Sequence, residues 1–348
     1  MSLDKKDWVC TQPFEFAEIF DESMFMCCPD WLPVDLGNPN NVSENWQSDK
    51  AKEVRESVTD GSYRFCDENR CPKLRGLKEG RSEGFISKHQ YDKVKDQYQD
   101  KFPEQLKFNF DRSCNLKCPS CRIDFINYDG DKRERTEELI RNIEDQLSRG
   151  LKMIDCTGTG DPFFSRTFRK WMMTFDSEKY PNLERIHLHT NGTLWNESNW
   201  TRMPNIHQYV KSAEISMDAA TKETYETKTR IGGNWDKLID NIHYISKIDT
   251  IERLTFSFVV QKDNFKEVEK FYKLIKSIFR YTNIHWVVQY TKVVNWGTFT
   301  DKQFKEVNVG DPSHPNFTEL MEIFNRIPKN HHIVHNLPTD SKWKKTLL

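Results

Sequence analysis

The sequence has no excess of charge of either sign, because 52 Lys and Arg residues are balanced by 53 Asp and Glu residues. This balance gives no electrostatic reason to expect binding to nucleic acid or to a membrane surface. No run of 18 apolar residues occurs, so we expect no transmembrane helix. The first ten residues, MSLDKKDWVC, also lack the apolar segment of a secretion signal, and we expect a cytoplasmic protein.

Internal repeats and low-complexity tracts are absent as well, and hydrophobic residues make up only 36% of the chain. Aromatic residues nevertheless reach 13%, including 10 Trp and 23 Phe, and each buries a large area. A sizeable core is therefore expected. The length of 348 residues suits about two domains.

Nine cysteines in a chain without a secretion signal predict metal or redox chemistry in a reducing compartment, not disulfides. Three of them, Cys114, Cys118 and Cys121, follow the spacing C-x3-C-x2-C just after a strand-like stretch. A loop this short can direct three thiolates at one [4Fe–4S] cluster, for which cysteine is the usual ligand. Three ligands leave the fourth iron open to another molecule.

A zinc site or a ferredoxin-type cluster fits this cysteine triplet less well. Structural zinc takes four Cys or His ligands, but the next cysteine after the triplet is Cys156. A bacterial ferredoxin would show C-x2-C-x2-C-x3-C-P, which does not match. Chance clustering among nine cysteines is the remaining alternative.

From residue 105 onward the hydrophobic pattern alternates between strands and helices. The expected strands are 106–110, 153–156, 185–189, 214–217, 254–260 and 285–290, and the expected helices are 133–148, 167–174, one ending near 248, and 265–279. Strands joined by crossover helices predict a parallel sheet with right-handed connections. Six such units are fewer than the eight of a closed barrel.

Short polar motifs follow three of these strands. Thr157-Gly158-Thr159-Gly160-Asp161-Pro162 follows the second, His189-Thr190-Asn191-Gly192-Thr193-Leu194 ends the third, and Glu214-Ile215-Ser216-Met217-Asp218 ends the fourth. Thr229-Arg230-Ile231-Gly232-Gly233 comes further on. Individually, these motifs are also typical of ordinary turns or, for Arg230, of a surface salt bridge.

With the cysteine triplet, these motifs make the chain resemble the radical S-adenosylmethionine (SAM) superfamily, up to about residue 300. The resemblance implies an α/β fold, an open, partial (β/α)6 TIM-like barrel over residues 105–300, with the active site at the carboxyl ends of its strands. It also implies that SAM contacts Gly158, Gly160, Asp161, Thr190, Asn191, Ser216, Asp218 and Arg230. Asp161 stands where Glu is commoner. Ser120 stands where the family often has an aromatic residue near the adenine. Phe125 is a candidate to supply that apolar contact instead.

Residues 1–76 contain five more cysteines, Cys10, Cys27, Cys28, Cys66 and Cys71, with little helical periodicity. We interpret them as a small, loop-rich module that needs a metal for stability, followed by a connector, 77–104. The module resembles the auxiliary-cluster modules called SPASM or twitch domains. That resemblance implies a second [4Fe–4S] cluster on Cys10, Cys66, Cys71 and one of Cys27 and Cys28, with Cys27 preferred. A four-cysteine zinc site is the alternative.

The resemblance implies reductive cleavage of SAM to a 5′-deoxyadenosyl radical that takes a hydrogen atom from a substrate. Modification of a ribosomally made peptide is the leading hypothesis. The alternatives are a sugar or aminocyclitol dehydrogenase or epimerase, and a non-catalytic iron–sulfur electron carrier. An external donor such as flavodoxin or ferredoxin would supply the electron. Cys156, on the second strand, is a candidate hydrogen-atom donor, although a small buried thiol is the simpler interpretation. Residues 301–348 are expected to cap the barrel.

Overall fold

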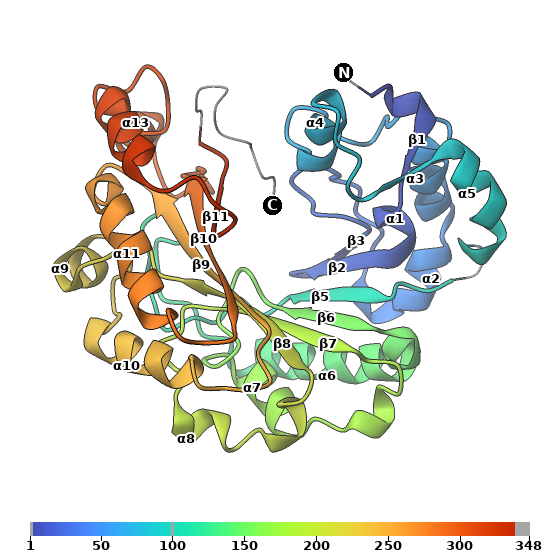
Figure 1. Ribbon diagram of the computed structural model, residues 1–348. Helices are drawn as coiled ribbons and strands as arrows, with labels where there is room; N and C mark the ends of the chain where they lie inside the picture. The colour runs from blue at the N-terminus through green and yellow to red at the C-terminus, as the bar shows by residue number, and fades with distance from the viewer. Residues whose placement is uncertain (1–2, 99–100, 338–348) are drawn as a thin grey trace. The chain divides into compact units, whose positions relative to one another are not determined.

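The computed structural model describes residues 3–98 and 101–337, and the chain divides into two compact units. Unit 1 comprises Met1–Asp111, Asp129–Thr159 and Phe175–Ile186; unit 2 comprises Arg112–Tyr128, Gly160–Thr174 and His187–Leu348. Each unit therefore takes segments from distant parts of the sequence (Figure 1). Within the described ranges, no helix is long and apolar enough to span a membrane.

Unit 1 contains six strands and six α-helices among its described residues. The strands are β1 (Trp8–Cys10), β2 (Phe16–Phe20), β3 (Ser23–Phe25), β4 (Phe85–Ser87), β5 (Gln105–Asn109) and β6 (Met153–Cys156). The helices are α1 (Gln12–Glu15), α2 (Val42–Gln47), α3 (Asp49–Thr59), α4 (Pro72–Lys78), α5 (Lys88–Val94) and α6 (Gly130–Leu147). Strands β1 and β4 form an antiparallel pair, and β3, β2, β5 and β6 are neighbours in that order.

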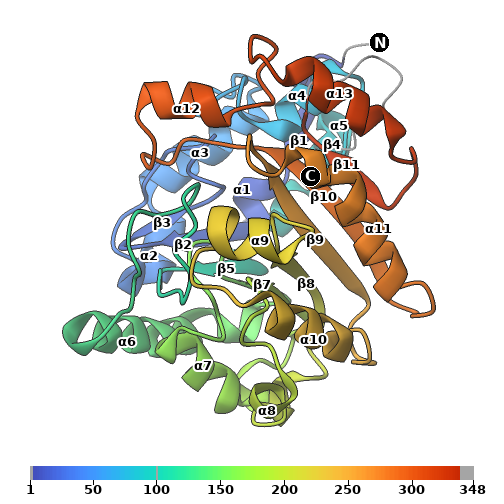
Figure 2. The same ribbon diagram turned by 90° about the vertical axis from the view of Figure 1, so that its left-hand side faces the viewer.

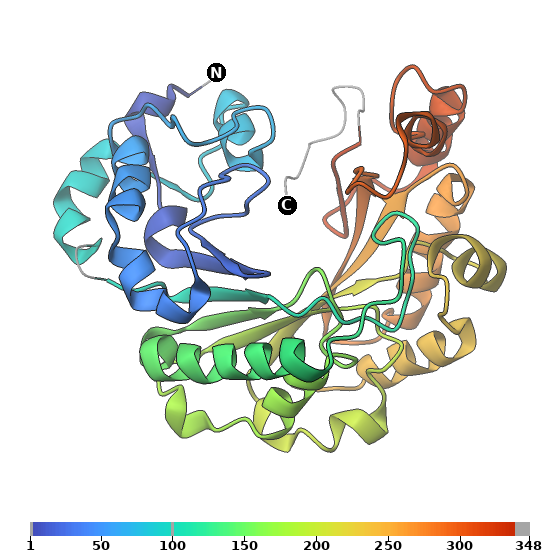
Figure 3. The ribbon, with the colours of Figure 1, turned by 180° about the vertical axis from the view of Figure 1, so that it is seen from behind.

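The parallel pairing of β2, β5 and β6 aligns side chains across three strands. Leu106, Phe108, Ile154 and Cys156 are buried on one face, and the long helix α6 runs along the strands of this unit (Figure 3). Because side chains alternate along a strand, the opposite face carries Glu18, Lys107 and Asp155, which are register partners in one row. We call these three residues the charged row of unit 1.

Unit 2 contains the remaining strands and helices. Its strands are β7 (Arg185–Thr190, whose first two residues belong to unit 1), β8 (Val210–Ser216), β9 (Arg253–Val260), β10 (His285–Lys292) and β11 (Ile333–His335). Its helices are α7 (Arg166–Met173), α8 (Glu197–Trp200), α9 (Lys222–Thr224), α10 (Trp235–Ile245), α11 (Val268–Ile278), α12 (Asp301–Val307) and α13 (Phe317–Arg326). A five-residue π-helix, Tyr225–Thr229, follows α9.

The sheet of unit 2 follows the chain, with β7, β8, β9, β10 and β11 as successive neighbours and β8 to β11 parallel. Helices α10 and α11 lie along these strands (Figures 1 and 2). Helix α11 buries Val268, Phe271, Tyr272 and Ile275, a 3–4 spacing that places all four on one side of a helix. In β9 every residue is buried except exposed Arg253 and partly exposed Val259, as expected for a strand covered on both faces.

The predicted α/β alternation is confirmed, because all six expected strands and the crossover helices are present. The strands that were not predicted are β1, β2 and β3 in the cysteine-rich N-terminal part, β4 in the connector, and β11 near the C-terminus. The N-terminal part is also less irregular than expected, since α3 extends over 11 residues with Val54 and Val58 buried. Of the proposed C-terminal cap, residues 338–348 lie outside the described residues.

Candidate functional site: a cysteine loop and a four-thiol cavity

The cysteine triplet lies in unit 2, on the loop that follows β5. A backbone hydrogen bond from Cys114 N to Ile126 O (2.9 Å) closes the loop, and Cys118 O accepts from both Cys121 N (2.9 Å) and Arg122 N (3.0 Å). Cys114 and Cys118 are buried and Cys121 is exposed. Burial raises the pKa of the Cys114 thiol to about 12 and also raises that of Cys118. Because only thiolates bind metal, a bound cluster would have to hold them deprotonated.

Each of the three thiols has an N–H donor directed at its sulfur. Asn191 Nδ2 lies 3.6 Å from Cys114 Sγ, Arg230 Nη1 lies 3.5 Å from Cys118 Sγ, and Arg122 Nη2 lies 3.5 Å from Cys121 Sγ. Hydrogen bonds to the ligating sulfurs are one of the features that tune an iron–sulfur cluster. The donor set of three thiols on one short loop therefore fits a [4Fe–4S] cluster with one iron unligated by this loop.

Arg230 and Asp218 form a buried ion pair beside the cysteine loop. Arg230 Nη2 lies 2.7 Å from Asp218 Oδ2, and the two side chains are only 11% and 2% exposed. Asp218 Oδ1 also accepts a hydrogen bond from Val259 N (2.7 Å). Arg230 Nε is buried without a hydrogen-bond partner in the described part of the chain. The pair lies inside unit 2, so the alternative that Arg230 forms a surface salt bridge is wrong.

The backbone around Arg230 is unusual in two respects. Arg230 ends the π-helix, with Arg230 N bonded to Tyr225 O at 2.8 Å, and π-helical turns are frequent at functional sites. Gly232 has φ +92°, and a Cβ there would stand 3.1 Å from the Phe125 ring. A Cβ at Gly233 would stand 2.5 Å from the Tyr225 ring, so glycine is required for this close approach. Phe125 itself is 59% exposed.

Asp161 is fully buried and its carboxylate is completely occupied by donors from unit 2. Oδ2 accepts from Thr190 Oγ1 (2.7 Å) and Asn191 N (2.8 Å), and Oδ1 accepts from Phe163 N (3.0 Å) and Phe164 N (3.1 Å). The structure thus brings Asp161, Thr190 and Asn191 together, whereas their contact with SAM stays a prediction. In this arrangement Asp161 orders two loops and has no free oxygen for a ligand's amino group.

Asn191 connects the end of β7 to the cysteine loop. Its Nδ2 donates to Asn115 Oδ1 (2.9 Å) as well as to Cys114, and its Oδ1 accepts from Thr193 Oγ1 (2.6 Å). Ser216 lies on the next strand and is hydrogen-bonded to His189 Nε2 (3.0 Å) and Ser257 Oγ (3.1 Å). Sequence reasoning did not select His189 or Ser257, although the His-Leu-His alternation of β7 placed polar groups on one face.

Gly158 lies in unit 1, in a strained turn after β6. Thr157 has φ +68°, and Asp218 in unit 2 has φ +54°; such conformations in non-glycine residues cost energy and cluster at functional sites. Thr159 N and Oγ1 donate to Asn109 Oδ1 (2.9 and 2.8 Å). Cys156, by contrast, has no exposed surface and lies on the buried face of β6. Its role as a hydrogen-atom donor stays a prediction.

The charged row of unit 1 leaves acidic oxygens unpaired. Glu18 Oε1 accepts from Asn109 Nδ2 (2.8 Å) and lies 3.7 Å from Lys107 Nζ. Glu18 Oε2 and Asp155 Oδ1 are buried without a hydrogen-bond partner among the described residues. Burial raises the pKa of Asp155 to about 6, with Glu18 adding to the effect and Lys107 opposing it. A buried, unpaired carboxylate is costly, so these oxygens are suited to a ligand that supplies donors.

Four of the five N-terminal cysteines surround one small cavity in unit 1, and they are Cys10, Cys27, Cys66 and Cys71. Trp31 Nε1 donates to Cys27 Sγ (3.0 Å) and Leu74 N donates to Cys71 Sγ (3.5 Å). Burial raises the pKa of all four thiols, that of Cys66 to about 12. Four cysteines that line one cavity supply the number of ligands needed by either a fully ligated iron–sulfur cluster or zinc.

Cys28 lies outside this group. It does not line the four-thiol cavity, and the charged groups that act on its thiol are Glu18, Asp30 and Lys107. Burial raises the pKa of Cys28 to about 11. Of the two neighbouring cysteines left open by the sequence, the geometry therefore favours Cys27 as the ligand.

Comparisons with known proteins place a family match over the cysteine loop and the strands around it. Residues 108–275 match the family model described as the radical SAM superfamily. No curated protein matches the chain. One similar structure is Streptococcus suis SuiB bound to S-adenosylmethionine, with 13% identity and a TM-score of 0.44 over 84% of this chain and 62% of that one. Another is anSMEcpe with bound AdoMet, with 21% identity and a TM-score of 0.40 over 55% and 50% of the two chains. The match therefore spans less than two thirds of the length of either structure.

Proposed function

Because residues 108–275 match the radical SAM superfamily, we propose that Cys114, Cys118 and Cys121 hold a [4Fe–4S] cluster at which SAM is reductively cleaved. The observation that carries this proposal is the set of three thiols on one loop, each with an N–H donor at its sulfur. When bound, the cluster and SAM supply the electron and the 5′-deoxyadenosyl radical, which takes a hydrogen atom from the substrate. A non-catalytic electron carrier would not need residues that bind SAM, such as Arg230.

The residues of unit 2 would bind and orient SAM. Arg230 is suited to the SAM carboxylate, because Nε has no partner among the described residues and the ion pair with Asp218 fixes the guanidinium plane. Ser216 offers its hydroxyl to the ribose side. Thr190, Asn191 and Asp161 would act by ordering the loops, so that Gly160 presents backbone to the SAM amino group. For Gly158, in unit 1, the proposal depends on the family resemblance alone.

The four-thiol cavity of unit 1 would hold an auxiliary [4Fe–4S] cluster of the SPASM or twitch kind, ligated by Cys10, Cys27, Cys66 and Cys71. A fully ligated cluster cannot bind SAM. It would therefore transfer electrons, or stabilise the fold of the N-terminal module, in which metal binding and folding are coupled.

Peptide modification leads among the possible reactions, because modules of this kind are frequent in peptide maturases. Oxidation or epimerisation of a sugar or aminocyclitol is the second candidate, and the charged row of unit 1 is compatible with either kind of substrate. The unpaired oxygens of Glu18 and Asp155 suit a substrate that brings ammonium, guanidinium or hydroxyl donors. A basic side chain of a peptide and an aminocyclitol both satisfy this requirement.

The experiment that tests the core of this function removes the three loop thiols together. The variant Cys114→Ala/Cys118→Ala/Cys121→Ala should produce no 5′-deoxyadenosine from SAM under dithionite, whereas Cys28→Ala, which removes one thiol outside both groups, should retain substrate-independent cleavage. Liquid chromatography measures the 5′-deoxyadenosine that each variant produces. SAM cleavage at the wild-type rate in the triple variant would show that the loop cysteines do not hold the cluster that cleaves SAM.

A further inference from the structure

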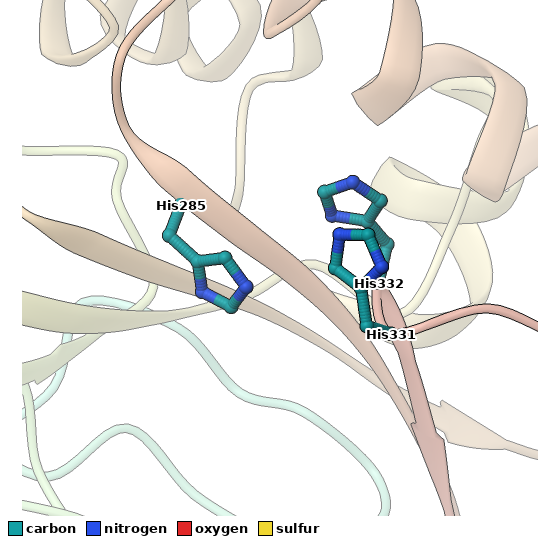
Figure 4. A group of neighbouring side chains, drawn as sticks. All are labelled: His285, His331 and His332. Carbon is teal, nitrogen blue, oxygen red and sulfur yellow. The ribbon is translucent and has the colours of Figure 1, made fainter.

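Three histidines of unit 2 lie together at the start of two neighbouring strands, whereas Ser216 and Asp218 lie at the carboxyl end of β8. His285 is the first residue of β10, and His331 and His332 directly precede β11 (Figure 4). One ring nitrogen of each lies within 4.8 Å of those of the other two. We propose that His285, His331 and His332 form a binding site for a divalent ion of the zinc type.

His332 is held in the form that binds metal. Its Nδ1 lies 2.7 Å from the carbonyl oxygen of Trp286. A carbonyl oxygen only accepts hydrogen bonds, so Nδ1 carries a proton, and the metal would bind through Nε2. The ring also stacks on Trp286, at 4.0 Å between centroids and 9° between planes. A hydrogen bond from the second ring nitrogen to a backbone carbonyl is the usual support of a metal-bound histidine.

The backbone that carries the ligands is fixed on both sides. Val288 N donates to His332 O (2.8 Å), and His332 N donates to Asn330 Oδ1 (3.0 Å). On the other strand, His285 N donates to Glu252 O (2.9 Å). Two strand starts and one turn thus present three imidazoles without rearrangement of the main chain.

The distances between the histidine ring nitrogens can reach those of a zinc site by side-chain rotation alone. Zinc–nitrogen bonds of about 2.0–2.1 Å in a tetrahedron place ligand nitrogens about 3.4 Å apart. The observed limit of 4.8 Å therefore has to shrink by about 1.4 Å. His285 and His331 are exposed and can rotate toward the fixed ring of His332. A water molecule would complete the four ligands.

A set of three imidazole ligands favours particular metals. Imidazole suits zinc, copper and nickel, whereas magnesium and calcium prefer oxygen ligands. Arg253, the register partner of His285, adds a positive charge that weakens binding of a cation, so we expect affinity in the micromolar range. The bound ion would join the start of β10 to the turn before β11, and would stabilise a terminal strand of only three residues.

The test uses holoprotein that has been reconstituted anaerobically and carries no polyhistidine tag, titrated with zinc chloride in a calorimeter. Wild type should bind one zinc ion more per chain than His285→Ala/His331→Ala, with the remaining zinc binding identical. His243→Ala, which removes an exposed histidine of α10, should behave as wild type. Zinc should also raise the thermal midpoint in wild type and in His243→Ala but not in the double variant.

Cobalt(II) distinguishes this site from the cysteine sites. The extra equivalent in wild type should give weak visible bands without the intense near-ultraviolet absorption of cobalt–thiolate bonds. Equal zinc stoichiometry in wild type and the double variant, or thiolate absorption for the extra equivalent, would overturn the proposal. Because zinc binding does not require SAM cleavage, either result leaves the proposed function untouched.

Discussion

Single residues of the candidate site carry charges that the fold must compensate. Arg230 and Asp218 are the clearest case, because both are nearly inaccessible and each is the other's partner. A buried pair of this kind contributes little net stability by itself, but removing one partner leaves an isolated buried charge. The contribution of the Arg230–Asp218 pair to stability can therefore be measured separately from the contribution of Arg230 to SAM binding.

We predict that Arg230→Met and Asp218→Leu each lower the free energy of unfolding by about 3–5 kcal/mol, and that the double variant loses clearly less than their sum. Urea unfolding of the four proteins of this cycle measures the coupling. SAM affinity should fall in both variants that lack Arg230, even in the double variant that recovers stability. Additive losses of stability would show that the two charges do not interact.

Asp155 provides a prediction about pH. Its pKa in the folded protein is raised to about 6, above the unfolded value of about 3.9. A carboxyl group with a raised folded pKa favours folding in its protonated form, so its contribution is fully present below about pH 4 and is lost as the pH rises through about 6. Asp155→Asn, which cannot ionise, should therefore gain about 1–2 kcal/mol of unfolding free energy relative to wild type between pH 5 and pH 7.5.

The comparison is made by urea unfolding at each pH. Asp92→Asn, a change at an exposed residue, is the control and should show no such trend. A constant difference between wild type and Asp155→Asn across this range would mean that Asp155 titrates normally in the folded protein.

At the scale of elements, glycines decide where a strand end can touch a helix. Gly192 follows β7 with φ +74°, and a Cβ there would stand 2.9 Å from Leu238 Cδ1 on α10 and 3.0 Å from Ile215 Cγ2 on β8. Gly150, after α6, has no atom within 4 Å of such a Cβ and no positive φ. The two positions therefore form a matched pair.

We predict that Gly192→Ala lowers the free energy of unfolding by about 2–4 kcal/mol, from strain at positive φ and overpacking. Gly150→Ala should change it by less than about 1 kcal/mol in either direction. Denaturant midpoints with unchanged slopes give both values. Equal effects of the two substitutions would contradict the packing seen around Gly192.

Much of this element-level order could be predicted from the sequence. The strands β5 to β10 were predictable because apolar runs of strand length alternate there with amphipathic helices. Strand β11 has only three residues, and β2 lies in a cysteine-rich region. The periodicity of hydrophobic residues therefore did not indicate either strand. The charged row required knowledge of register, since Glu18, Lys107 and Asp155 are far apart in sequence and only strand pairing aligns them.

For the site, residue type and local spacing predicted a role for the cysteine loop, Asn191, Asp218 and Arg230, and this role stays a prediction. They did not identify what each side chain contacts. Asp161 looked like a ligand-binding residue, yet four protein donors occupy its carboxylate. The histidines His285, His331 and His332 escaped notice because a long stretch of sequence separates the first from the others and no short motif links them.

At the scale of the whole molecule, the two groups of thiols lie in different units. The three loop thiols are in unit 2 and the four cavity thiols are in unit 1. Each group has its own donors and its own burial, so loss of a metal bound by one group of thiols need not remove a metal bound by the other.

We predict that Cys66→Ala/Cys71→Ala lowers the iron content of the holoprotein by about half and loosens the N-terminal module, because binding of the proposed cluster would be coupled to folding of that module. SAM cleavage should persist at least in part, while formation of the substrate-derived product falls much more. Iron per chain, with EPR or Mössbauer spectra, and the two product yields are the measurements. An unchanged iron content would show that the cavity holds no iron–sulfur cluster.

The exposed imidazoles of His285 and His331, beside His332, affect how the protein behaves during purification. Immobilised nickel presents open coordination positions to any surface that offers adjacent histidines, so the untagged chain should be retarded on such a resin and elute at low imidazole. Protein prepared in that way will carry leached nickel. Elemental analysis should therefore assign metal to the cysteines only after the histidine equivalent has been subtracted, for which His285→Ala/His331→Ala serves as the blank.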